Sequence, residues 1–188
     1  MTEEAKGPVL ETAILGGGCF WCLEAVFDLV DGVESVVPGY CGGHVDNPGY
    51  RQVCTGGTGH AEVVKVDFDP ARVSYRELLE IFFLIHDPTT VDRQGNDVGP
   101  QYRSVIFVTS DAQLHDALAL IEDIGEQRVY PKAIVTRVER APVFWPAEAE
   151  HHDYYMNNSD QPYCQYVVAP KIAKYRAKLA ERRRGSGR

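Results

Sequence analysis

A run of three glycines, Gly16 to Gly18, constrains this chain most, because it joins an apolar segment directly to Cys19. The segment from Val9 to Leu15 predicts a strand that enters the glycine turn. Apolar residues then recur at helical spacing from Leu23 to Val30, which predicts a helix directly after the turn. We therefore expect Cys19 near a helix N-terminus, where the helix dipole favours the thiolate.

Two large aromatic residues, Phe20 and Trp21, follow this cysteine. Their position predicts a reactive thiol in an aromatic pocket. The alternative is an inert, buried cysteine beside two ordinary core residues, which is the commoner fate of these residue types. The segment alone leaves both interpretations open.

The length of 188 residues and the hydrophobic content of 44% predict one domain over residues 1–188, with a single buried core. We expect residues 1–8 and 183–188 to be frayed termini. Strand and helix patterns alternate along the chain, which indicates an α/β or α+β fold with helices packed on a mixed sheet. The expected strands are 33–37, 61–68, 104–108 and 134–138, and the expected helices are 75–85, 112–124 and 171–182. Residues 38–49, 86–103 and 142–170 are expected to be loops or irregular segments.

The formal net charge of −8 argues against general binding to nucleic acids or to anionic membrane surfaces, which require a basic face. The sequence shows neither a signal peptide nor an apolar run long enough to span a bilayer, so we expect a cytoplasmic protein. In a reducing compartment, cysteines at positions 19, 22, 41, 54 and 164 do not suggest a static disulfide framework. Catalysis, redox cycling and metal binding remain as their possible roles.

Glu62 is a candidate proton donor because it stands between a glycine turn and the apolar residues of the strand predicted at 61–68. A carboxylic acid in an apolar setting has a raised pKa and can hold a proton near neutral pH. The alternative is a surface glutamate on an edge strand.

The spacing of Cys19 and Cys22 allows a disulfide at a helix start, as in thioredoxin-like sites. A second interpretation adds Cys41 and His44, which together give the ligand types of a Cys₃His zinc site. The bulky residues between the first two cysteines argue against a tight metal knuckle.

Eight separated blocks then point to one family. They are Gly18-Cys19-Phe20-Trp21, Gly39-Tyr40 with Gly42-Gly43, Asn47-Pro48-Gly49-Tyr50, Gly59-His60-Ala61-Glu62, His86-Asp87-Pro88, Arg93-Gln94-Gly95-Asn96-Asp97, Gln101-Tyr102-Arg103-Ser104, and Ala147-Glu148 with His151. In this order and spacing the chain resembles peptide methionine sulfoxide reductase of the A type, from about Ala13 to Lys178. The resemblance implies a ferredoxin-like mixed sheet with extra coils, and an enzyme that reduces methionine S-sulfoxide, free or in proteins, in the repair of oxidised proteins.

The resemblance also implies roles for individual residues. Cys19 is the nucleophile that becomes a sulfenic acid, and Phe20 and Trp21 hold the S-methyl group of the substrate. Glu62 donates the proton, and Tyr50 and Tyr102 bind the sulfoxide oxygen. Asp97 supports the pocket, and His151 lies near it.

Cys164 is the first choice for the resolving thiol that forms an intramolecular disulfide, because it lies in the irregular C-terminal region where the resemblance implies a recycling cysteine, and a mobile loop there can bring it to Cys19. Cys22 is the alternative. Cys41 is either a bystander or a relay thiol, and Cys54 is expected to pack as a small apolar residue.

The family further implies thioredoxin as reductant, no bound cofactor or metal, and we expect a monomer. A zinc-binding module, and a protein that binds oxidised methionine without turnover, remain as alternatives from other classes.

Overall fold

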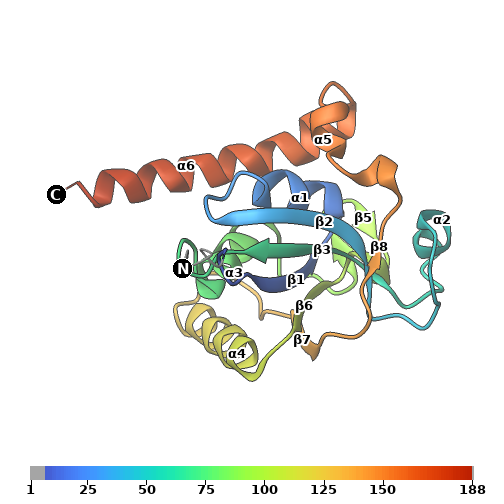
Figure 1. The fold of residues 1–188 in the computed structure, drawn as a ribbon, viewed down its shortest axis with the longest axis horizontal. Helices are drawn as coiled ribbons and strands as arrows, with labels where there is room; N and C mark the ends of the chain where they lie inside the picture. The colour runs from blue at the N-terminus through green and yellow to red at the C-terminus, as the bar shows by residue number, and fades with distance from the viewer. Residues whose placement is uncertain (1–6, 188) are drawn as a thin grey trace, which may run out of the picture.

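The computed structural model describes residues 7–187 and is built around one six-stranded sheet (Figure 1). Its strand order is β7-β6-β1-β3-β2-β8, and only the β6–β7 pair is parallel. The strands are β1 (Glu11–Gly17), β2 (Val33–Cys41), β3 (Ala61–Phe68), β6 (Ser104–Val108), β7 (Arg137–Arg140) and β8 (Trp145–Pro146). A separate two-stranded ribbon joins β4 (Arg93–Gln94) to β5 (Asp97–Val98). This mixed sheet with packed helices confirms the predicted fold class.

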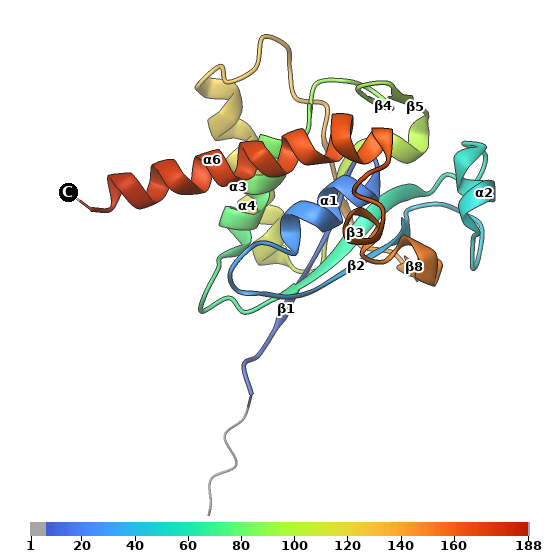
Figure 2. The same cartoon turned by 90° about the horizontal axis from the view of Figure 1, so that it is seen from above.

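The helices are α1 (Phe20–Phe27), α2 (Tyr50–Cys54), α3 (Tyr75–Ile85), α4 (Asp111–Glu126), α5 (Tyr154–Asn157) and α6 (Ala169–Gly185). Short 3₁₀ turns cover Pro100–Tyr102 and Ala149–His151, and a π-helical turn covers Cys164–Val168. Seen from above, α6 crosses α1 and α3, and its C-terminal half extends beyond the rest of the protein (Figure 2). No helix among residues 7–187 has the length and apolar character that a bilayer crossing needs.

The two faces of the sheet bury different sets of residues because strand side chains alternate. One face carries Leu15, Val64 and Ile106 into the main core, where they pack with helices α1, α3, α4 and α6. The opposite face carries a smaller cluster that includes Ile14 and Val105. That cluster is covered by the coil around Ala141 and Phe144 rather than by a helix.

Three expected elements coincide with the structure, namely β3, α3 and β6. At α3, the Ser74 hydroxyl accepts a hydrogen bond from the Glu77 N–H at 3.1 Å, and the Glu77 carboxylate accepts one from the Ser74 N–H at 2.7 Å. This is the predicted capping box. Local sequence was sufficient at these places because propensity, periodicity and capping all favour the same structure.

The glycine-rich segment from Pro38 to Cys41 was expected to be a loop, but it continues β2. Gly39 explains why: a Cβ there would lie 2.4 Å from the Phe144 ring, so the missing side chain lets the coil that leads into β8 approach. Tyr40 and Cys41 then alternate into opposite cores.

The expected termini and the last helix also differ from the structure. The last helix begins at Ala169 rather than Lys171, because a proline such as Pro170 is tolerated in the first turn of a helix. Residues 183–185, expected to fray, continue α6. The strand expected at 134–138 lies at 137–140. Residues 1–6 and 188, also expected to be frayed, lie outside the described residues.

Candidate active site

Cys19 stands directly before α1, as the glycine turn predicted. Gly18 has a φ of +94°, and a Cβ there would lie 2.7 Å from Cγ of Gln94, so both conformation and space require glycine. Cys19 itself is extended and is 7% exposed. The turn therefore holds the thiol at the N-terminus of α1, against the 86–97 loop.

Glu62 lies on β3, which is flanked by β1 and β2, so the edge-strand interpretation is wrong. The side chain is 1% exposed, and its Oε1 accepts a hydrogen bond from the Phe20 N–H at 3.2 Å. Its Oε2 is buried without a hydrogen-bond partner among the described residues. Burial raises the pKa of Glu62 to about 8, so the acid holds its proton at neutral pH. The expected raised pKa is confirmed.

Aromatic rings surround the start of α1. Phe20 is buried, with its ring centroid 6.3 Å from that of Tyr50 and 5.3 Å from that of His151. Trp21 stacks on Tyr154 at 3.6 Å with an interplanar angle of 5°, and its Nε1–H donates to Nδ1 of His151 at 3.1 Å. The aromatic cluster expected around Cys19 is therefore present, and His151 and Tyr154 fix the orientation of Trp21.

Tyr154 was not identified from the sequence. It belongs to the four-residue helix α5, in a segment expected to be irregular, and nothing in its local pattern singles it out from the other tyrosines. Only the packing of the C-terminal segment against α1 reveals its contact with Trp21.

Tyr50 and Tyr102 come from separate segments and are both brought toward Glu62. Tyr50 opens α2, and Tyr102 ends the 3₁₀ turn after β5. Burial, and then the negative charge of ionised Glu62, raises the pKa of both phenols. Both side chains therefore remain hydrogen-bond donors at any physiological pH.

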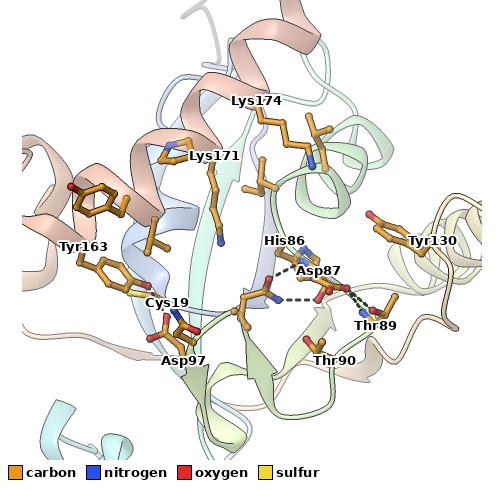
Figure 3. A pocket seen from close by; sticks show the side chains of 18 of the residues that line it. Cys19, His86, Asp87, Thr89, Thr90, Asp97, Tyr130, Tyr163, Lys171 and Lys174 are labelled. Carbon is orange, nitrogen blue, oxygen red and sulfur yellow. Dashed lines mark hydrogen bonds between the residues drawn. The ribbon is translucent and has the colours of Figure 1, made fainter.

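Asp97 lies on β5 and joins the small ribbon to the C-terminal segment. Its Oδ2 accepts a hydrogen bond from the Tyr163 hydroxyl at 2.7 Å, close to Cys19 (Figure 3). The carboxylate therefore orients Tyr163, a neighbour of Cys164 that the sequence did not single out.

Three thiols lie on the helix-covered side of the sheet: Cys19, Cys22 and Cys164. Burial, the hydrogen bond to Cys22 and the charge of Glu62 raise the pKa of Cys19 well above its ordinary value. The expectation that the helix dipole would favour a Cys19 thiolate is therefore wrong for the free protein, because burial outweighs the dipole. The hydrogen bond from Cys19 lowers the pKa of Cys22 instead.

Cys164 is fully buried in the π-helical turn that precedes α6, where the turn packs against α1. It does not lie in an irregular loop, so the setting expected for this cysteine is wrong. Cys54 is exposed at the end of α2, which contradicts its expected packing as a small apolar residue.

The four candidate zinc ligands do not converge. Cys19 and Cys22 belong to the main core, whereas Cys41 lies in the small cluster on the opposite face of the sheet. Within residues 7–187, the groups of three or more side chains close enough to share a metal ion contain no cysteine; they are Glu148 with Glu150 and His151, and Glu24 with Asp28 and Asp153. The zinc-module alternative is therefore wrong.

A thiol at a helix start, a protonated acid beside it, an aromatic wall and a second thiol in hydrogen-bond contact define a thiol-dependent redox enzyme. Comparison with known proteins specifies the family. The model of the peptide methionine sulfoxide reductase family matches residues 11–183.

Relatives with established names agree with this match. Peptide methionine sulfoxide reductase MsrA of Ralstonia nicotianae is 55% identical, over 97% of this chain and 96% of its own. The protein of the same name from Saccharolobus solfataricus is 54% identical, over 88% and 93%. Reduced Mxr1 of Saccharomyces cerevisiae superposes with a TM-score of 0.78 at 34% identity, over 87% and 92% of the two chains. The chain belongs to the peptide methionine sulfoxide reductase family, and it is an oxidoreductase that acts on methionine sulfoxide.

Proposed function

We propose that this chain reduces the S epimer of methionine sulfoxide, free or in proteins, with Cys19 as the nucleophile. One observation carries the proposal: Glu62, an acid with a pKa of about 8, accepts a hydrogen bond from the backbone N–H next to Cys19 and has a free buried oxygen. Attack on a sulfoxide sulfur needs a proton on the leaving oxygen, and a protonated carboxylic acid can supply it.

The first step transfers one oxygen atom. The Cys19 sulfur attacks the sulfoxide sulfur, Glu62 protonates the oxygen, and the Cys19 proton restores Glu62. The oxygen then passes, as a hydroxyl group, from the substrate sulfur to the Cys19 sulfur while the transient sulfur–sulfur bond breaks, so methionine leaves and Cys19 becomes a sulfenic acid, Cys–SOH. A neutral Glu62 places no negative charge beside the attacking Cys19 sulfur. Ionised Glu62 would raise the pKa of Cys19 and so disfavour its thiolate.

The surrounding side chains suit the groups on the sulfoxide sulfur. Phe20 and Trp21 offer aromatic surface to the S-methyl group, a favourable contact for a methyl on polarisable sulfur. Tyr50 and Tyr102, which remain protonated, donate hydrogen bonds to the sulfoxide oxygen. Asp97 supports the pocket through Tyr163.

The second step forms a disulfide and releases water when a second thiol attacks the sulfenic acid. We propose Cys164 as the resolving thiol, with Cys22 as the alternative. The contact between the Cys19 and Cys22 thiols is the observation that keeps Cys22 as the alternative.

Thioredoxin is the reductant that we propose for the resulting disulfide. The support is a solved complex of yeast Mxr1 with Trx2, which matches this chain with a TM-score of 0.55 at 27% identity over 80% of its length. The cytoplasmic location and the monomeric state remain predictions from the sequence.

A single-turnover experiment tests the proposal. Fully reduced protein is mixed with L-methionine-S-sulfoxide without reductant, and methionine formed and free thiols lost are counted. We expect about one methionine and two lost thiols per chain, since one disulfide forms per sulfenic acid resolved. Cys19→Ser should form no methionine, whereas Cys41→Ala, a matched change on the opposite face of the sheet, should behave like the parent.

Methionine formation by Cys19→Ser would remove Cys19 from the role of nucleophile. Binding of the sulfoxide without any methionine in the parent would favour the alternative of a sulfoxide-binding protein.

A further inference from the structure

A cavity of about 780 Å³ is lined by Cys19 but not by Glu62 (Figure 3). It runs between the 84–97 segment, the loop at 130–132 and the start of α6. Its volume lies within the range of small-ligand pockets. Cys19, Asp97 and Tyr163 line this cavity as well as the site described above, whereas its lysines have no role in the mechanism described above.

Lysines dominate the charge of this cavity. Lys171 and Lys174 reach it from α6, and Lys132 reaches it from the opposite loop. None of the three forms an ion pair with another of residues 7–187, in a chain whose formal charge is −8.

The two carboxylates that line the cavity are already engaged in hydrogen bonds. Asp97 accepts the Tyr163 hydroxyl, and Asp87 accepts both the backbone N–H and the hydroxyl of Thr89, at 2.9 and 2.6 Å. Neither carboxylate forms an ion pair with Lys171 or Lys174, although the charge of Lys132 acts on Asp87.

The lysines belong to a basic stripe along one face of α6, formed by Lys171, Lys174, Lys178 and Arg182. The distal members are neutralised within the chain: Lys178 pairs with Glu181 at 3.5 Å, and Arg182 pairs with Glu80 at 2.7 Å. Only Lys171 and Lys174, beside the cavity, form no ion pair within the described part of the chain. The charge of Lys171 acts inward, since it contributes to lowering the pKa of the buried Cys22.

We propose that this lysine-lined cavity binds acidic residues that flank an oxidised methionine in a polypeptide substrate. The inference rests on the proposed function, and it specifies the class of substrate. An extended peptide places alternate side chains about 7 Å apart on one face, and side chains at positions i and i+3 of a helix are about 5–6 Å apart. Two carboxylates of one peptide can therefore meet Lys171 and Lys174 while the sulfoxide reaches Cys19.

Peptide pairs that differ only in charge test this inference. Each blocked peptide carries one central L-methionine-S-sulfoxide with three residues on either side, either aspartates or their isosteric asparagines. With dithiothreitol as reductant, the ratio of kcat/KM for the two peptides cancels any general change in thiol reactivity. We expect a ratio of about 5 at low ionic strength, typical of two partly exposed ion pairs, and a fall toward 1 as salt is added.

Variants assign the preference to the lysines. In Lys171→Gln/Lys174→Gln the ratio should fall to about 1, and Lys174→Gln alone should give an intermediate value. Lys178→Gln is the matched control, because its charge is already paired on the same helix, and it should keep the parent ratio.

The other outcomes distinguish failure of the proposed function from failure of the lysine subsite. Turnover of neither peptide would refute the proposed function itself. Equal turnover of both peptides by the parent, or an unchanged ratio in the double variant, would refute the lysine subsite alone. If the double variant instead lost only turnover with thioredoxin, the lysines would bind the reductant, and the inference would be wrong.

Discussion

The raised pKa of Glu62 predicts that ionisation of this one side chain destabilises the fold. In the folded protein the pKa is about 8 against an ordinary value of 4.5, so the folded state binds more protons than the unfolded state between these pH values. The contribution of Glu62 to the free energy of unfolding is therefore present at acidic pH and is lost as pH rises toward 8. Each pH unit within this window corresponds to about 1.4 kcal/mol.

Glu62→Gln removes this titration while its amide oxygen can still accept the Phe20 N–H. Between pH 5 and pH 8, the free energy of unfolding of the variant should rise relative to the parent by about 3 kcal/mol. Glu24 and Asp28 also have raised pKa values, about 7 and about 6, because they are partly buried. Both remain in the variant, so their contributions cancel in the difference.

Urea unfolding of both proteins at pH 5, 6, 7 and 8, with the thiols kept reduced, measures the difference. Glu122→Gln is the matched control, because it makes the same change of side chain at an exposed position of α4. Parallel stability curves for the parent and Glu62→Gln would show that Glu62 is ionised in the folded protein at neutral pH. That result would refute the reasoning behind its role as proton donor.

Two further predictions concern the resolving thiol and the glycine turn. Cys164→Ser should still form about one methionine per chain without reductant but lose recycling by thioredoxin; if recycling persists there and is lost in Cys22→Ser, Cys22 is the resolving thiol. Gly18→Ala should lower the free energy of unfolding by about 1–3 kcal/mol, because φ is +94° and Gln94 fills the space. Gly125→Ala, in open space near the end of α4, should raise it by up to about 1 kcal/mol. Equal effects of the two glycine changes in thermal or urea unfolding would contradict this account.

Several parts of the site were predictable because their signals are local. The glycines before Cys19 and the apolar spacing after it placed the thiol at a helix start, and Ser74 with Glu77 fixed the beginning of α3. The place of Glu62 beside apolar strand residues suggested a buried acid but left a surface glutamate on an edge strand as the alternative, and the central position of β3 decided between them. Tyr50, Tyr102 and Asp97, by contrast, were identified only through family resemblance, because no local pattern distinguishes them.

The sequence by itself determined the strand, turn and helix that present Cys19, because short-range periodicity and glycine conformation specify them. Tertiary structure decided the chemistry of that thiol. Contacts between residues 42, 66 and 130 positions apart bring Glu62 to Phe20, Tyr163 to Asp97 and His151 to Trp21. Burial raises the pKa of Cys19, against the local effect of the helix dipole. Local sequence cannot encode that reversal, because desolvation depends on every segment that packs around the thiol.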